Sequence, residues 1–382
     1  MSEKLYYRDS HIKDFSATVL DCVEAEGAWL VELDRTAFFP EGGGQYSDTG
    51  VIDGVLVSDV QEEGDTIWHK VAEPIEVGTI VECSINWPER FEKMQCHTGE
   101  HIISGIVHAL YGYDNVGFHL GEDYVTLDFD GPLTREQLDK VEDIACAVIA
   151  SNVPVETSFP APAELAMMEY RSKLDLTENV RIVSIPGVDV CACCAPHVAY
   201  TGEVGMLKLL DCVKHKKGVR IFMTAGFRLL RDYRMRYTQT AQVSSMLAVP
   251  QAGIVEGVER LQKECADLSY QLKGVKIEKA MAELEKVQKD GENMVMFVDN
   301  WDYDVMVPVA DKGKTMTQGV FALFSATGEG QYRYVIASET VDLRAKTREI
   351  NQAINGKGGG NSNLIQGKAC GEEEALRKAM IF

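Results

Sequence analysis

Long apolar runs are missing from this sequence of 382 residues, and no segment is apolar over the length that a helix needs to cross a bilayer. The first residues, MSEKLYYRDS, also lack the apolar core of a secretory signal peptide. We therefore expect a soluble cytoplasmic protein with no membrane contact. Hydrophobic residues make up 45% and charged residues 25%, which is typical of globular proteins, and the length predicts two or three domains.

Positive charge is scarce, because the formal net charge is −21. Over the whole chain this argues against a nucleic-acid partner. Residues 206–236 are the exception, with nine basic and two acidic residues, a formal charge of +7 against −28 for the remainder. This basic stripe can hold a phosphate backbone, and a solvated charged face is an equally good interpretation. The candidates for backbone contacts are Lys214, Lys216, Lys217 and Arg220.

Signs of a disulfide framework are also lacking, because ten cysteines in a long chain without an export signal indicate reduced thiols. Six of them stand alone among apolar or helical residues, and we expect small core side chains there: Cys22, Cys83, Cys96, Cys146, Cys265 and Cys370. Cys191, Cys193 and Cys194 differ, since they lie within four positions and are followed by His197. These residues are candidate metal ligands.

Strand and helix signals begin with two contrasting regions. Residues 1–86 carry short β-branched runs, such as Val51–Val60 and Thr79–Ile85, and predict a small β-barrel. Residues 87–238 open with a helix over 87–112 and predict an α+β domain, with helices against an antiparallel sheet. The other elements expected there are strands at Val116–Leu120, Tyr124–Asp130, Arg181–Ile185, Glu203–Leu210 and Val219–Thr224, and a capping-box helix from Thr134 to about Ser151.

Residues 239–288 are predicted to form a helical linker with coiled-coil character. Its apolar seam has the spacing 4, 3, 4, 3, 4, 3 and consists of Ile254, Val258, Leu261, Cys265, Leu268, Leu272 and Val275. Three such heptads predict a coiled coil and a homodimer, and an amphipathic helix packed on its own domain is the alternative. Residues 289–382 return to an α/β pattern, in which NGKGGGNSN is expected to be a loop before a last helix to Phe382.

Two pairs of metal-ligand residues occur in the region 87–238. His97 and His101 lie four positions apart on the expected helix, so both imidazoles share one face. Cys193 and His197 form a second pair in a segment that contains Pro196. Together they predict a tetrahedral site, and one thiolate with three imidazoles favours a single Zn²⁺ ion per chain. Cys191 and Cys194 remain rival ligands to Cys193.

The HTGEH sequence also fits the pattern of the inverted zinc proteases. In that interpretation Glu100 is a general base beside a metal-bound water. Here the second ligand pair would be a cysteine and a histidine instead of a downstream carboxylate, which weakens the peptidase alternative.

A glycine loop, TAFFPEGGGQYSDTG, spans Thr36–Gly50. Consecutive glycines let the backbone approach a ligand closely and adopt positive φ. Gln45 offers an amide for a substrate carbonyl or ribose, and Thr36 offers a hydroxyl. No Walker lysine and no helix pattern follow, so a phosphate loop is not indicated. A plain turn between barrel strands is the alternative.

Three motifs follow one another in a recognisable order: PEGGGQYSDTG, HTGEH and the Cys-x3-His of CCAPHVAYTGEVG. This combination resembles the editing domain of alanyl-tRNA synthetase, and still more its free-standing relatives, the alanyl-tRNA editing (AlaX) proteins. The heptads and KGGGNSNLIQGK (Lys357–Lys368) are similar to the synthetase's C-terminal DHH-associated domain, although no Asp-His-His triplet occurs. The resemblance covers essentially the whole chain and corresponds to the long form of the family.

The resemblance implies a trans-editing hydrolase that deacylates mischarged Ser-tRNA(Ala), with Gly-tRNA(Ala) as a further candidate substrate. It implies that His97, His101, Cys193 and His197 bind zinc, and that mischarged tRNA(Ala) is the partner of the basic stripe. In the family the glycine loop lines the amino-acid pocket, which carries over to Gly43, Gly44 and Gln45. A threonine before that loop accepts the serine hydroxyl, and Thr36 is the matching residue.

An aminoacyl ester is already labile, so the site must mainly position water and stabilise an oxyanion. Four protein ligands close the coordination of zinc, which predicts that the ion orients the substrate more than it ionises water. Gln45, Glu100 and Glu41 are the catalytic candidates, beside the terminal hydroxyl of the tRNA itself. The rival functions are a zinc peptidase built on HTGEH and a non-catalytic tRNA-binding adaptor with structural zinc.

Overall fold

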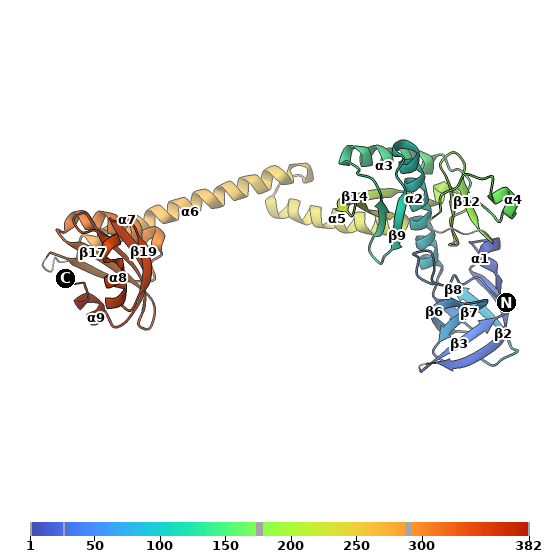
Figure 1. The fold of residues 1–382 in the computed structure, drawn as a ribbon, viewed down its shortest axis with the longest axis horizontal. Coiled ribbons are helices and arrows are strands. Elements are labelled where there is room, and N and C mark those ends of the chain that lie inside the picture. The colour runs from blue at the N-terminus through green and yellow to red at the C-terminus, as the bar shows by residue number, and fades with distance from the viewer. Residues whose placement is uncertain (1, 26, 173–178, 288–291, 381–382) are drawn as a thin grey trace. The chain divides into compact units, whose positions relative to one another are not determined.

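The computed structural model describes residues 2–25, 27–172, 179–287 and 292–380. The chain divides into two compact units, Met1–Thr240 and Ala241–Phe382 (Figure 1). The first unit therefore contains both the region 1–86 and the whole of the region 87–238. The expected boundary between residues 238 and 239 falls within one continuous helix, α5 (Gly226–Leu247). The four-part division of the chain stays a prediction.

The N-terminal part of the first unit is a closed barrel of six strands. In barrel order the strands are β2 (Asp14–Ala25), β3 (Ala28–Leu33), β7 (Thr66–Val71), β6 (Val55–Glu63), β5 (Gly50–Ile52) and β8 (Ile80–Ile85). Alternate residues of β7 point inward, so Ile67, His69 and Val71 are buried. The short pair β1 (Glu3–Lys4) and β4 (Arg35–Thr36), and helix α1 (Leu5–Arg8), complete this part.

A four-stranded sheet with two long helices forms the rest of the unit's main core. Its strand order is β14 (Leu207–His215), β15 (Gly218–Ala225), β10 (Val125–Phe129) and β9 (Asn115–Leu120), with antiparallel neighbours. Helices α2 (Trp87–Tyr111) and α3 (Arg135–Ala150) share one buried cluster with one face of this sheet. Thr134 and Gln137 make the expected capping box at the start of α3. The mixed α+β architecture agrees with the sequence prediction.

A smaller sheet lies beside α2. It contains β11 (Glu156–Ser158), β12 (Ile182–Ile185) and β13 (Asp189–Ala192) in that order. Helix α4 (Pro162–Leu165) lies between β11 and β12 along the chain, and a 3₁₀ turn at Thr201–Val204 follows the sheet. The second ligand pair of the candidate site, Cys193 and His197, follows β13 along the chain.

The second unit contains the sheet β16–β17–β18–β20–β19 and the long helix α6 (Ile254–Leu284). The strands are β16 (Met294–Asp299), β17 (Val320–Gly328), β18 (Gln331–Ser338), β19 (Lys357–Gly360) and β20 (Leu364–Cys370). The other helices are α7 (Tyr303–Gly313), α8 (Leu343–Ala353) and α9 (Glu373–Lys378), with 3₁₀ turns at Gln251–Gly253 and Lys314–Met316. None of the helices in the described ranges is long and apolar enough to cross a bilayer.

Several local expectations were wrong. The glycine-rich segment after residue 356 forms the strand β19, because its backbone groups make hydrogen bonds to β20. The last helix is only the short α9. Residues 381–382 of the expected helix lie outside the described residues. The strand expected at Glu203–Leu210 begins at Leu207, because residues 201–204 form the 3₁₀ turn. Cys83 and Cys96 are buried as expected, Cys22 and Cys146 are half-buried, and Cys265 and Cys370 are exposed.

Gly105 sets how closely α2 approaches the segment before β13. A Cβ atom added there would overlap the carbonyl oxygen of Val188 and crowd Cβ of Asp189. Gly99, on the same helix, would place its Cβ 3.6 Å from Ala225 and Met223, an ordinary contact. The absent side chain at Gly105 therefore lets Asp189 approach the helix.

We expect Gly105→Ala to destabilise the protein by about 1–3 kcal/mol, because the overlap forces the backbone apart. Gly99→Ala is the control. It should leave stability unchanged or raise it by up to about 1 kcal/mol, because alanine has the higher helix propensity and no clash opposes it. Thermal unfolding of the two variants checks this. Equal unfolding temperatures for both variants would contradict the close packing of α2 against Val188.

Candidate metal centre and active site

Four side chains converge on one point in the first unit. The nitrogen atoms of His97, His101 and His197 and Sγ of Cys193 all lie within 4.8 Å of one another. Cys193 Sγ is 3.6 Å from His97 Nε2 and 3.4 Å from His197 Nε2. Ligand atoms around a tetrahedral zinc ion are separated by roughly 3.3–3.8 Å, given bonds of about 2.0–2.3 Å. The four residues therefore have the spacing and the chemistry to hold one metal ion.

Each imidazole has a different partner at its Nδ1 atom. His97 Nδ1 lies 2.9 Å from the amide oxygen of Gln45, and His101 Nδ1 lies 2.8 Å from the Asp189 carboxylate. His197 Nδ1 is 3.3 Å from the hydroxyl of Thr98. An amide oxygen and a carboxylate accept hydrogen bonds, so the Nδ1–H groups of His97 and His101 donate. Their Nε2 lone pairs are then available for a metal.

The side chains of the cluster alone favour a Cys193 thiolate, a neutral His197 and a positively charged His101. Burial raises the pKa of Cys193, but the imidazoles of His97 and His197 and a hydrogen bond with His101 lower it further, so the net pKa lies well below the ordinary value. Burial lowers the pKa of His197 to about 3, despite the nearby thiolate. His101 has a raised pKa, because Glu100 and Asp189 outweigh the effect of burial. A bound metal ion would supply the positive charge that a protonated His101 otherwise provides beside these acidic groups.

The loop that carries Cys193 and His197 is held from both sides. The guanidinium of Arg181 donates to the carbonyl oxygens of Cys193 and Ala195, at 3.0 and 2.8 Å. The Cys193 N–H donates to the carbonyl of Arg181 at 3.0 Å. On the barrel side, the hydroxyl of Ser10 donates to the carbonyl of His197 at 2.6 Å. The second ligand pair is thus fixed although it lies outside helices and strands.

A buried ion pair connects the first turn of α2 to the glycine loop. Arg90 Nε donates to the Asp48 carboxylate at 2.8 Å, and both side chains are almost fully buried. The same guanidinium donates to the carbonyl of Ala37 at 2.6 Å, and Lys93 donates to the carbonyl of Ser47 at 2.6 Å. These contacts place Gln45 beside His97, although the two residues are 52 positions apart.

The metal cluster opens on a cavity of about 1360 Å³. Its walls come from α2, the glycine loop, β9 and the segments around β12 and β13. The sequence-predicted residues that line this cavity are Gly43, Gly44, His97, Glu100, His101, Cys191, Cys193 and Cys194. His197 is not part of its wall. Gly44 adopts φ +82°, and a Cβ atom there would lie 2.6 Å from the carbonyl of Phe118. The backbone of the loop therefore approaches β9 more closely than any other residue type would allow.

Glu100 is a buried carboxylate at the wall of the cavity. Its Oε1 accepts hydrogen bonds from Ser104 at 2.7 Å and from Asn115 at 2.6 Å. Its Oε2 lies 3.7 Å from His101 Nε2, on the side of that imidazole that faces the cluster. A carboxylate in this position can accept a proton from a water molecule in the cavity.

The structure does not bring Thr36 and Glu41 to the cavity. Thr36 is fully buried in the barrel, where its Oγ1 is 2.8 Å from His69 Nε2. His69 Nδ1 faces the carbonyl of Val31 at 2.9 Å, so Nε2 is the acceptor and the Thr36 hydroxyl donates. Burial lowers the pKa of His69 to about 4 and keeps this ring neutral. Glu41 is exposed and contacts Gln61 at 3.2 Å. Gln45 does not line the cavity either, and acts through His97.

The rival cysteines occupy other positions. Cys191 groups with His101 and Asp189 in a second, adjacent cluster. Cys194 faces the glycine loop, since a Cβ on Gly43 would lie 3.3 Å from its Sγ. Burial and the neighbouring Cys193 raise the pKa of Cys194 to about 11, which keeps it a protonated thiol at neutral pH. Cys193 is the cysteine that meets all three histidines.

The basic stripe is partly neutralised within the described residues. Five of its nine basic side chains have acidic partners, in the pairs Lys208–Glu142, Arg220–Asp128, Arg228–Glu92, Arg231–Glu92 and Arg236–Asp232. Lys214, Lys216 and Lys217 are exposed at the β14–β15 turn and make no ion pair in that part of the chain. These three lysines therefore hold the free positive charge of the turn, while Arg220 is committed to Asp128.

Sequence reasoning missed the residues that support the ligands. Asp189 also accepts two hydrogen bonds from Arg171, at 2.7 and 2.8 Å, which fixes its orientation toward His101. A signal was available, because Asp189 and Cys191 share one face of β13, and Cys193 directly follows the end of this strand. Thr98 carried no comparable signal, since a threonine within a helix is common without any role.

Comparisons with known proteins agree with this geometry. The family model "Threonyl and Alanyl tRNA synthetase second additional domain" matches residues 180–221, which include Cys193 and His197. The model "tRNA synthetases class II (A)" matches residues 3–89. The alanyl-tRNA editing protein AlaX-L of Pyrococcus horikoshii is 29% identical, with 98% of this chain and 96% of the relative covered. The chain is thus similar to an alanyl-tRNA editing protein over almost its full length.

Other proteins are similar to this chain over nearly the same length. An alanyl-tRNA editing protein of Xenopus laevis is 29% identical over 95% of this chain and 92% of its own length. The alanine–tRNA ligase of Ignicoccus hospitalis is 30% identical over 98% of this chain, which spans 42% of that larger protein. Among solved structures, the C-Ala domain of Aquifex aeolicus alanyl-tRNA synthetase is 20% identical and covers 25% of this chain and 96% of that domain, with a TM-score of 0.21, too low to bear on the fold.

We expect Asp189→Asn to weaken Zn²⁺ binding about 10- to 100-fold, because the substitution keeps the shape of the side chain but removes the charge that faces His101 Nδ1. Competition with a chromophoric chelator measures the affinity. Asp139→Asn, at an exposed position on α3, is the matched control. Wild-type Zn²⁺ affinity in a folded Asp189→Asn variant would contradict a role of Asp189 in the metal site.

Proposed function

We propose that the protein is a trans-editing hydrolase that cleaves the ester bond of mischarged Ser-tRNA(Ala), with Gly-tRNA(Ala) as a further substrate. The observation that carries the proposal is the His97–His101–Cys193–His197 cluster, which opens on a cavity whose wall includes Gly43 and Gly44. The curated relatives over almost the full chain carry the name of alanyl-tRNA editing proteins. Since aminoacyl-tRNA is used in the cytoplasm, the proposed substrate implies that location.

Zn²⁺ is the ion that we propose for the cluster, because one thiolate with three imidazoles is a donor set that suits zinc. When bound, the ion supplies a fixed positive charge that attracts the polar groups of the aminoacyl end. His97, His101, Cys193 and His197 would hold it. The bonds from Gln45, Thr98 and Asp189 orient the three imidazoles before the substrate arrives.

The protein groups around the cavity can perform the remaining chemistry. Within the described residues, no acceptor faces the N–H groups of Gly43 and Gly44. We propose that they stabilise the negative charge that develops on the ester carbonyl oxygen when water attacks. Glu100 takes the proton of that water, and Ser104 and Asn115 hold its carboxylate in place. The carbonyl carbon–ribose oxygen bond then breaks, and the ribose oxygen takes up the proton from Glu100, which releases free serine and tRNA.

Discrimination against correctly charged Ala-tRNA(Ala) requires a polar group that pairs with the serine hydroxyl. A pocket built for a hydroxyl disfavours the analogue that lacks it, because its own polar groups are left unpaired. Thr36 remains the family-based candidate, and its hydroxyl already bonds His69 inside the barrel. Its role in the selection of serine stays a prediction.

The homodimer is a separate part of the proposal. Along α6, the seam residues Val258, Leu261, Leu268, Leu272 and Val275 are exposed in the single chain. Their heptad spacing is typical of helices that pair with a second copy. The coiled coil and the DHH-associated character of residues 289–382 stay predictions.

We expect the purified protein to deacylate Ser-tRNA(Ala) and to leave Ala-tRNA(Ala) intact. A chelator should abolish the activity, and added Zn²⁺ should restore it. Glu100→Gln should lower kcat about 10²- to 10⁴-fold with zinc still bound, because the proton acceptor is lost. Glu41→Gln, at an exposed carboxylate outside the cavity, is the control. Release of labelled serine and the metal content measure these outcomes.

The two rival functions give different results in the same assay. A zinc peptidase would cleave peptides in a Glu100-dependent manner and would leave Ser-tRNA(Ala) charged. An adaptor with structural zinc would bind tRNA without turnover and would unfold when the chelator removes the metal.

We expect the double substitution of Lys216 and Lys217 by Glu to weaken tRNA binding and to reduce the slope of log affinity against log salt by about 2, because two phosphate contacts are lost. Lys140→Glu, at an exposed lysine on α3, is the control for charge alone. Binding of uncharged tRNA(Ala) over a range of salt concentrations measures the slope. Wild-type affinity and slope in the double variant would exclude the β14–β15 turn from the tRNA site.

A further inference from the structure

Two chain segments meet at one edge of the cavity. One is the glycine loop, with Gly43 and Gly44, and the other is β9, with Phe118. They are tied together by a hydrogen bond from the Leu120 N–H to the carbonyl of Gly44, at 2.9 Å. The Phe118 ring in turn packs against the imidazole of His97, with ring centroids 4.4 Å apart. This edge is therefore rigidly connected to the metal cluster.

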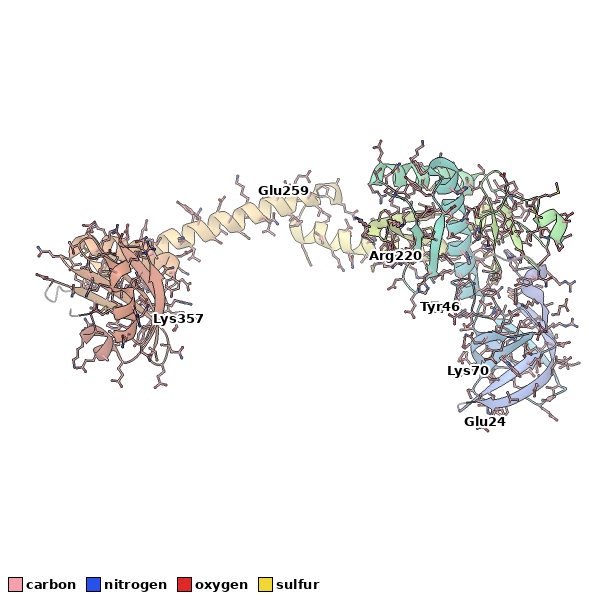
Figure 2. All side chains as sticks on the ribbon, in the orientation of Figure 1. Glu24, Tyr46, Lys70, Arg220, Glu259 and Lys357 are labelled. Carbon is pink, nitrogen blue, oxygen red and sulfur yellow. The ribbon has the colours of Figure 1, made fainter. Side chains whose placement is uncertain are left out.

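Directly outside this edge, each segment presents an exposed ring. Side chains alternate along the loop, so Gln45 points inward to His97 while Tyr46 is 44% exposed. His119 follows Phe118 and is exposed as well. Tyr46 Oη lies 3.5 Å from His119 Nε2, and the rings meet edge to face with centroids 5.6 Å apart. Figure 2 labels Tyr46 on the same unit as Arg220.

The outer face of the four-stranded sheet continues from this ring pair toward the basic turn. His119 is paired with Thr126, which is paired with Phe222 on β15, and all three share the face opposite the helices. Arg220 lies two residues from Phe222 on that same face. Two strand spacings and two residues correspond to about 12 Å. The free lysines at the β14–β15 turn lie beyond Arg220.

We propose that Tyr46 and His119 form a stacking platform for the unpaired nucleotide that adjoins the aminoacylated 3′-terminal nucleoside of the substrate tRNA. The inference rests on the proposed function and names a binding site for that same substrate. The reacting ester is on the terminal ribose, so the terminal nucleoside must enter the cavity. The preceding nucleotides must then leave across the cavity edge.

The chemistry of the platform suits a single-stranded RNA end. Exposed aromatic rings stack on bases without regard to sequence, and neighbouring basic groups attract the backbone. Both conditions hold here, because the ring pair lies on the sheet face that leads to Lys214, Lys216 and Lys217. The RNA end is the proposed partner, because the rings adjoin Gly44 and Phe118 at the edge of the cavity that the terminal nucleoside would enter.

Fluorescence of a modified, uncharged tRNA(Ala) tests the platform directly. The probe is 2-aminopurine in place of the nucleotide that precedes the 3′-terminal adenosine. Stacking should quench its fluorescence on the wild-type protein and on Tyr46→Phe, which keeps the ring. Tyr46→Ala and the double variant with His119→Ala should lose the quenching and bind about 10-fold more weakly. Tyr200→Ala removes a similarly exposed tyrosine, 49% accessible, that does not line the cavity, and should match wild type.

Activity on two substrates supplies the second test. Tyr46→Ala should raise the KM for Ser-tRNA(Ala) about 10-fold and leave the hydrolysis of 3′-seryl-adenosine unchanged, because that small ester has no nucleotide to stack. Unaltered quenching in the double variant, or an equal loss on both substrates, would overturn the platform. If wild-type protein hydrolyses neither ester, the proposed function fails, while the 2-aminopurine signal still decides whether the rings bind the RNA end.

Discussion

The ion pair between Arg90 and Asp48 is the constraint on which the candidate site depends. It joins the first turn of α2 to the glycine loop, and both side chains are withdrawn from water. Loss of one partner of such a pair costs about 3–5 kcal/mol, because an uncompensated charge stays buried. The Asp48 carboxylate also accepts the N–H of Phe39 at 2.7 Å, so the loop backbone is held by the same group. The ion pair thereby fixes the position of the barrel relative to α2, which carries His97 and His101.

The three imidazoles of the cluster are oriented by hydrogen bonds at their Nδ1 atoms. Gln45 reaches His97 from the loop, Asp189 reaches His101 from β13, and Thr98 reaches His197 from the helix itself. Each support comes from a different element, so a shift of any one element would turn one imidazole away. The close approach at Gly105 and the hydrogen bonds of Arg181 to the ligand loop belong to the same arrangement. A rigid cluster of this kind suits an ion that holds a substrate, because its ligands need not rearrange during the reaction.

The basic residues of the stripe differ in whether their charge is paired with an acidic side chain. The acidic chain repels polyanions in general, and the lysines at the β14–β15 turn are the part of the stripe that keeps its charge free. Other basic residues of the stripe serve the fold, as in the pairs of Arg228 and Arg231 with Glu92. A count of basic residues therefore overstates the surface that can contact a phosphate backbone.

Local patterns of the sequence alone determined α2, its shared face for His97 and His101, the capping box of α3 and the heptad seam, because each depends on residues within one or two turns. They also indicated two strand-forming runs of the barrel, Val51–Val60 and Thr79–Ile85. The glycine-rich β19 was missed, since its pairing depends on β20 and not on its own residues. Only the tertiary structure decided that Asp189 and Gln45 support the ligands, that Thr36 faces His69, and that Tyr46 meets His119. These contacts join residues far apart in the chain, and their existence depends on how separate elements pack, which no local spacing encodes.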